Sequence, residues 1–214
     1  MVYYTTLTVI CLSFLSSLIA FRLDYPFHLK LISGLLGFTV ISELFITKLI
    51  HHIWKGTTNI PWYNIVMLVE FFVYAWYYYC ILKNKALRKI ILAYLVILPV
   101  SWFILTFRVF HLTNWNSYID IAGSIFTVCL SVALYHQLFT APELVRLSKS
   151  PEFWIATALI LYYSGSLPFT SMLDFLTEKV RPLAKSFVTI LQILNILLYT
   201  LIGYAYLCRI KTKK

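Results

Sequence analysis

The sequence is poor in charged residues, and in acidic ones most of all. Asp and Glu together supply 8 of 214 residues against 18 Lys and Arg, and charged residues of both signs make up only 12% of the chain. A typical soluble domain carries about 25% charged residues. Because 61% of the residues are hydrophobic, we do not expect a soluble globule. The net charge of +10 then needs an explanation other than nucleic-acid binding.

Cysteine and histidine are also scarce, and neither forms a pattern that holds a metal. The four cysteines contain no CxxC pair, which excludes a zinc ribbon and gives no basis for a disulfide framework. The HExxH, GxSxG, GxGxxG and P-loop motifs are absent. The last apolar run has neither a central lysine for a retinal Schiff base nor a histidine for metal-dependent hydrolysis. We therefore expect no cofactor, no metal and no enzymatic activity.

Long apolar runs fill most of the chain instead. A helix rises about 1.5 Å per residue, so roughly 20 residues cross about 30 Å of hydrocarbon. Seven runs have this length and follow one another with short connections: Tyr3–Phe21, Leu31–Trp54, Ile60–Leu82, Lys89–Phe107, Tyr118–Thr140, Phe153–Leu176 and Ser186–Leu207. The sequence predicts an all-α membrane protein, a single bundle of seven transmembrane helices over residues 1–214, in which sequential helices are antiparallel neighbours.

The basic residues predict how this bundle is oriented. With the N-terminus outside and the C-terminus inside, twelve Lys and Arg fall on inward segments and six on outward ones. This is the bias that cytoplasmic loops show. Most of it comes from Lys83–Lys89 and from the tail Arg209–Lys214. That tail and the inner loops are also where we expect a protein partner to bind, in addition to the surrounding lipid bilayer.

Polar side chains recur on several predicted helices at helical spacing. Thr39, Glu43, Thr47 and His51 are four residues apart, and Tyr63, Glu70, Tyr74 and Tyr77 share a face of the next helix, with Asn64 beside it. Asp120 begins a similar stripe on the fifth helix, and Gln192 and Asn195 share a face of the seventh. The fourth helix has little besides Pro99 and Ser101, so we expect it to face lipid. Polar stripes must face other helices or a cavity, because acyl chains offer no hydrogen bonds.

Two carboxyl groups are the most informative of these side chains. Glu43 and Glu70 lie near the middle of antiparallel neighbouring spans, which places them at similar depth. A charge at the centre of a span costs roughly 2.5–3.5 kcal/mol on insertion scales. No Lys or Arg is predicted at that depth, so we expect the pair to share a proton or to accept hydrogen bonds. The set Glu43, Glu70, Asn64, Thr39, Tyr74, Gln192, Asn195 and Asp120 is our candidate ligand- or proton-binding site. Hydrogen bonding between helices is the purely structural alternative.

A break is predicted in the sixth span. The run Tyr162-Tyr163-Ser164-Gly165-Ser166 is followed by Pro168, which removes a backbone donor and favours a kink. Interrupted helices of this kind line transport sites, although Pro and Gly are also common in ordinary spans.

Three short motifs carry a resemblance to a known group of proteins. They are Ile41-Ser42-Glu43, Tyr63-Asn64-Ile65 followed by Glu70-Phe71, and Pro151-Glu152-Phe153-Trp154-Ile155 leading into Tyr162-Tyr163-Ser164-Gly165. With these motifs the chain resembles small uncharacterised bacterial multi-pass membrane proteins, some similar to the membrane portions of bacterial sensor proteins. The resemblance implies a location in the bacterial cytoplasmic membrane and brings no ligand or catalytic residue with it.

Three functions fit these observations. The first is a sensor or receptor-like protein that binds a ligand in a polar interior around Glu43 and Glu70. The second is a small proton- or cation-coupled transporter or channel that uses the same carboxyls. The third is a structural subunit of a membrane complex, in which both carboxyls only stabilise the fold.

Overall fold

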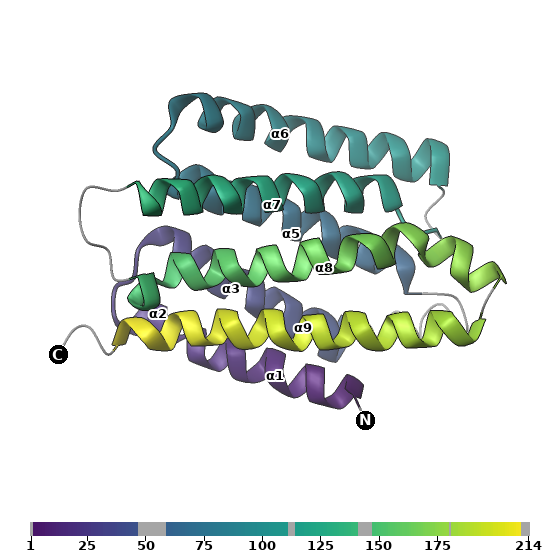
Figure 1. Ribbon diagram of the computed structural model, residues 1–214, viewed down its shortest axis with the longest axis horizontal. Coiled ribbons are helices and arrows are strands. Elements are labelled where there is room, and N and C mark those ends of the chain that lie inside the picture. Colours follow the sequence, from purple (N-terminus) through teal and green to yellow (C-terminus); the bar gives the residue numbers. More distant parts are fainter. Residues whose placement is uncertain (1, 47–58, 111–113, 141–146, 180, 211–214) are drawn as a thin grey trace.

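The computed structural model describes residues 2–46, 59–110, 114–140, 147–179 and 181–210, and all regular structure in these ranges is helical (Figure 1). The α-helices are α1 (Val2–Ser17), α2 (Ile19–Arg22), α3 (Phe27–Ile41), α5 (Ile60–Ile81), α6 (Lys85–Ile104), α7 (Ser117–Phe139), α8 (Pro151–Lys179) and α9 (Arg181–Ile210). Two π-helical segments, η1 (Ser42–Ile46) and η2 (Leu105–Phe110), extend α3 and α6, and a 3₁₀ turn, η3 (Leu147–Lys149), precedes α8.

Among the described residues, six helical segments are long and apolar enough to cross a membrane, by length and composition. They are Tyr4–Arg22, Phe27–Leu44, Ile60–Ile81, Lys85–Arg108, Ser117–Phe139 and Ser186–Cys208. The remaining long helix, α8, is not among them. Its middle carries the polar run Tyr162–Ser166, which dilutes its apolar character. The all-helical prediction is confirmed, and the composition of six helices fits a membrane protein.

Short polar signals set the helix boundaries where connections are tight. The Asn84 side chain accepts hydrogen bonds from the backbone N–H of Ala86 and Leu87, which caps the first turn of α6. Gln137 of α7 then fixes the same connection, because its amide accepts from the Lys83 N–H at 2.7 Å and donates to the Ile81 carbonyl at 3.1 Å. These bonds hold the end of α5 against α7.

In the part of the chain that the structure describes, six of the long helices form a closed ring and one lies outside it. Contacts run from α1 to α3, α5, α7, α8, α9 and back to α1, while α6 packs on the outside of α5 and α7 (Figure 1). Consecutive helices are neighbours, as predicted, and α5 and α7 also touch each other directly, which the sequence does not predict. Much of the surface of α6 is apolar and exposed, including Val96 and Phe103. That surface suits contact with acyl chains.

Two glycines stand at the contacts that close the ring between helices that are not consecutive. A Cβ on Gly123 of α7 would lie 2.4 Å from the ring of Phe71 on α5. A Cβ on Gly203 of α9 would lie 3.2 Å from the Cα of Ser13 on α1, and Ser16 donates a hydrogen bond to the Gly203 carbonyl at 3.3 Å. Small residues allow membrane helices to approach closely. The close approach of α5 to α7 and of α1 to α9 therefore depends on these two glycines.

The interior is packed solid at one end. Tyr77 and Tyr78 at the end of α5, Tyr206 at the end of α9, and Leu29 and Ile155 near the starts of α3 and α8 are all fully buried. The Tyr206 hydroxyl donates to the Leu29 carbonyl at 2.7 Å, which ties α9 to α3. This is the end of the bundle where α9 ends, opposite the start of α1 (Figure 1).

The structure changes one prediction about α8 and moves several boundaries. The helix is continuous from Pro151 to Lys179 with Pro168 inside it, so the predicted break is wrong. Neighbouring α7 and α9 hold the helix on both sides, and Pro168 costs it one backbone donor without ending it. The second helix begins at Phe27, four residues before the apolar run, because Pro26 fixes the extended turn ahead of it.

Candidate ligand cavity

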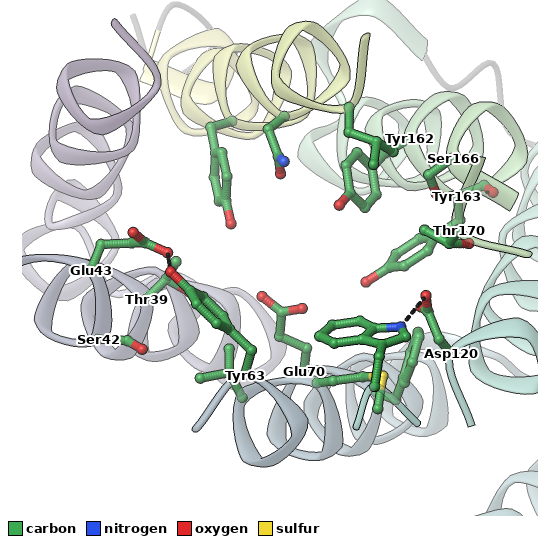
Figure 2. A pocket seen from close by; sticks show the side chains of 17 residues that line it. Thr39, Ser42, Glu43, Tyr63, Glu70, Asp120, Tyr162, Tyr163, Ser166 and Thr170 are labelled. Atoms are coloured by element: carbon green, nitrogen blue, oxygen red, sulfur yellow. Dashed lines mark hydrogen bonds between the residues drawn. The ribbon is translucent and has the colours of Figure 1, made fainter. Parts of the chain in front are cut away.

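A cavity of about 300 Å³ lies inside the ring, in the half away from the packed end (Figure 2). Helices α3, α5, α7, α8 and α9 all contribute to its wall, together with η1 and the residue Trp115 ahead of α7. Its lining consists of Thr39, Ser42, Glu43, Tyr63, Val66, Met67, Glu70, Phe71, Trp115, Asp120, Tyr162, Tyr163, Ser166, Thr170, Leu191, Asn195 and Tyr199.

A second cavity of about 250 Å³ adjoins the first on the side of α1. The two share the lining residues Glu43, Tyr63, Asn195 and Tyr199. The second adds Thr6, Leu7 and Ile10 from the first half of α1 and Gln192 from α9. The interior space therefore extends toward the end of the bundle where the chain begins.

Glu43 enters the cavity from a π-helical turn. The segment η1 follows α3 directly, and such turns displace side chains from the regular helical spacing. The Tyr63 hydroxyl of α5 donates a hydrogen bond to Glu43 Oε1 at 3.1 Å. Beside it, the indole N–H of Trp62 donates to the hydroxyl of Ser42. Two polar contacts from the start of α5 thus hold the π-helical turn in place.

Asp120 is a third carboxyl on the same cavity, opposite Glu43 (Figure 2). It is buried in the first turn of α7, where a negative charge interacts favourably with the helix dipole. The indole N–H of Trp115 donates to Asp120 Oδ2 at 3.3 Å. Asp120 therefore has a donor in the wall of the cavity.

Glu70 differs from the other two carboxyls. It comes from the middle of α5, and its carboxyl points into the cavity between the aromatic side chains (Figure 2). No hydrogen bond from the described residues reaches it, and it is close enough to Asp120 and Glu43 to interact with both electrostatically. A half-buried carboxyl without a donor loses part of its hydration uncompensated, which marks Glu70 as the group that a ligand would satisfy.

The cavity wall carries one sign of charge only. Its three acidic side chains are joined by no Lys, Arg or His among the described lining residues. Within the described part of the chain, no group of three or more His, Cys, Asp or Glu side chains is placed to hold a metal ion. The rest of the wall is aromatic or carries hydroxyl and amide groups.

The structure brings together most of the residues predicted as a site. Thr39, Glu43, Glu70, Asp120 and Asn195 line the first cavity, and Gln192 lines the second. Both glutamates line the first cavity, and Glu43 also lines the second. Thr47 and His51, which the predicted stripe on the second helix included, lie outside the described residues.

Two predicted site residues do not line either cavity. Asn64 is fully buried behind the wall, where its amide N–H₂ donates to the Asn114 carbonyl at 2.9 Å and its oxygen accepts from the Asn116 N–H at 3.2 Å. It anchors the turn before α7 and is a structural residue. Tyr74 is buried against Tyr163, with ring centroids 6.0 Å apart, so it supports the wall from behind.

Sequence reasoning missed part of the aromatic wall. A tryptophan in a connection between helices is ordinarily expected at the membrane interface, so its position alone gives no reason to place Trp115 on a cavity. The available signal was its position five residues before Asp120, which brings the indole back onto the carboxyl. Tyr162 and Tyr163 were noted only as part of a helix break. Both line the cavity from the unbroken helix α8.

Comparison with known proteins found no match to this chain among protein-family models, curated proteins or solved structures. The geometry of the cavity is therefore the basis for assigning a function.

Proposed function

We propose that this protein is a receptor-like membrane component that binds a small ligand in the cavity around Glu43 and Glu70. The observation that carries the proposal is that one half of the ring contains a cavity and the other half is filled with side chains. Hollow space lined by carboxyls occupies one half of the ring, and fully buried side chains such as Tyr77, Tyr78 and Tyr206 fill the other. A cavity with a solid floor suits binding, whereas a channel needs a continuous path.

In the proposed arrangement all seven long helices span the bacterial cytoplasmic membrane, with the N-terminus outside and the C-terminus inside. Two features support α8 as the seventh span: its length and its position between two candidate spans. Its 29 residues reach about 43 Å at 1.5 Å per residue, and it packs between α7 and α9, which are both candidate spans. With this orientation the cavity lies toward the outer face, where it would meet an external ligand.

Output would pass to a protein partner on the inner side. Basic residues cluster there, at Lys83, Lys85, Arg88 and Lys89 around the start of α6, and in the predicted tail. Ligand binding would act on the helices that share the cavity wall and continue to the inner end, above all α5, α8 and α9.

Transport is the second candidate, and a specific feature favours it. Pro168 interrupts the hydrogen-bond ladder of α8 between Ser166 and Thr170, which both line the cavity. A helix weakened at that point is suited to bending as a gate.

Mass spectrometry of the gently purified protein, followed by reconstitution, tests the proposal. A receptor should retain or rebind a small molecule in detergent and should move no proton, cation or ligand across liposomes. Flux of the bound molecule would favour the transporter. Constant recovery with one partner protein, together with no bound molecule and only a loss of stability in Glu70→Gln, would indicate a structural subunit instead.

A further inference from the structure

We infer that the ligand is a small organic cation, an amine whose ammonium group pairs with Glu70 inside the aromatic wall. This inference rests on the proposed binding function and adds the chemical class of the ligand. It follows from the sign of the charge in the cavity, the composition of its wall, its size and the unequal hydrogen bonding of its three carboxyls.

Charge excludes the opposite class of ligand. An anion in this cavity would face Glu43, Glu70 and Asp120 with no basic side chain among the described lining residues to pair with. In a site shielded from water such repulsion is strong, because the effective dielectric constant is low. A cation would instead be attracted, because its positive charge offsets the negative charge of the carboxyl groups.

Size and ligand geometry argue against a bare metal ion. The cavity holds about 300 Å³, which is about ten times the share of one water molecule in the liquid. The carboxyls are spread around this space, and the described residues provide no cluster that could coordinate one ion. Pockets that bind small organic ligands have volumes of about 300 Å³ and more.

The aromatic wall suits an organic cation in particular. Trp115, Tyr162 and Tyr163 line the same cavity as Glu70, and Phe71 packs against Tyr163 with ring centroids 5.5 Å apart. The faces of such rings attract ammonium groups, and the attraction grows when the cation is removed from water. The carbon skeleton of an amine would contact the same rings.

Hydrogen bonding identifies which carboxyl receives the ammonium group. Tyr63 donates to Glu43, and Trp115 donates to Asp120. Glu70 lies between them without a donor from the described residues. An ammonium group brings three N–H donors. It would satisfy Glu70 first, and its remaining donors would be directed toward the hydroxyl and amide groups of the wall.

Isothermal titration calorimetry with the full chain in detergent tests this inference. The amine probes are 2-phenylethylamine, with 2-phenylethanol and 3-phenylpropionate as its uncharged and anionic counterparts, and 1,4-diaminobutane, with 1,4-butanediol as its uncharged counterpart. At least one amine should bind, and its uncharged or anionic counterpart should bind at least about 30-fold more weakly. Loss of a buried charge partner costs 2 kcal/mol or more, and each 1.4 kcal/mol is tenfold.

Two acid-to-amide variants assign the effect to Glu70. Glu70→Gln keeps the shape of the side chain and should weaken amine binding by about 30-fold or more. Asp24→Asn is the matched control, because Asp24 is exposed at the other end of the bundle and Asn also tolerates its φ of 48°. It should bind amines like the parent chain. If Glu70→Gln does not fold, the comparison of amine with alcohol in the parent protein still decides whether the site prefers a cation.

The outcomes separate this inference from the proposed function. If a neutral or anionic molecule binds and the amines do not, the ligand class is wrong and the binding function stands. If amines bind equally well to Glu70→Gln, the assignment of the anchor is wrong. If no probe binds and mass spectrometry finds no retained molecule, the proposed binding function itself fails, and this inference fails with it.

Discussion

Replacing Gly123 by Ala should weaken the contact between α5 and α7 that completes the ring. The new Cβ would lie 2.4 Å from two carbons of the Phe71 ring, a distance at which something must shift. Phe71 is buried and packs against Tyr163, so its ring cannot move away freely. Overpacking of this kind costs about 1–3 kcal/mol, and the better helix propensity of Ala offsets about 1 kcal/mol of it.

Gly34→Ala is the matched control for that prediction. No atom lies within 4 Å of a Cβ built at Gly34, so this variant should gain up to about 1 kcal/mol from helix propensity alone. For a chain of this size 1 kcal/mol corresponds to about 2–4 °C in Tm. Tm values in detergent should therefore differ by about 2–12 °C, with Gly123→Ala the lower. Equal stabilisation by both changes would refute the close α5–α7 contact.

The same substitution should affect the cavity. Phe71 lines it, so a ring displaced by the new methyl group would move toward Tyr163 and reduce the space available. Ligand binding should weaken in Gly123→Ala and stay unchanged in Gly34→Ala. A stability loss without any change in binding would show that the ring relaxes away from the cavity.

Two further changes test the structural assignments. Asn64→Ala should lower the free energy of unfolding by about 1–3 kcal/mol, because it strands the buried Asn116 N–H, yet leave the affinity for a ligand intact in chemical-denaturation and calorimetric assays. Glu152 at the start of α8 pairs with His28 at 3.0 Å. Burial would raise the pKa of Glu152, but hydrogen bonds from His28 and Ser150 outweigh it and hold that pKa below its usual range. A pKa lower in the folded state means that the pair stabilises the protein above the usual Glu pKa of about 4.3, and that this stabilisation is lost as the pH falls through the folded value. Tm measured from pH 6 down to about pH 2, which spans the unfolded and the lowered folded pKa, should fall more steeply in the parent chain than in Glu152→Gln, and parallel curves would contradict the pairing.

Much of the fold was predictable because it depends on local properties of the sequence. Length and apolarity predict a helix over Lys89–Phe107, and the structure has α6 over Lys85–Ile104, four residues earlier, because Asn84 caps its first turn. The sequence does not show which helices meet when they are not consecutive. The α5–α7 and α1–α9 contacts depend on the absence of a side chain at Gly123 and Gly203. The residues that flank these glycines do not indicate that they lie at a contact between helices.

The candidate site was predictable to the extent that polar side chains avoid lipid. Glu43, Glu70 and Asp120 had to face inward because exposure to acyl chains is too costly. The sequence could not predict which of these carboxyls accepts a hydrogen bond from the wall and which does not, because that depends on the side chains that each one meets in the folded structure. Asn64 shares a helix with Glu70 and has similar polarity. It serves only to anchor the turn before α7, because its face of α5 meets Asn114 and Asn116.

The convergence of the three carboxyl groups on one interior space is tested most directly by intramolecular cross-linking. In a chain whose four native cysteines are replaced by serine, Glu70→Cys and Asp120→Cys should be joined by short bifunctional thiol reagents. The matched pair, Asp120→Cys with Ile97→Cys on the exposed face of α6, should not be joined. Thiols at positions 70 and 120 that react singly but never become cross-linked would contradict a shared cavity.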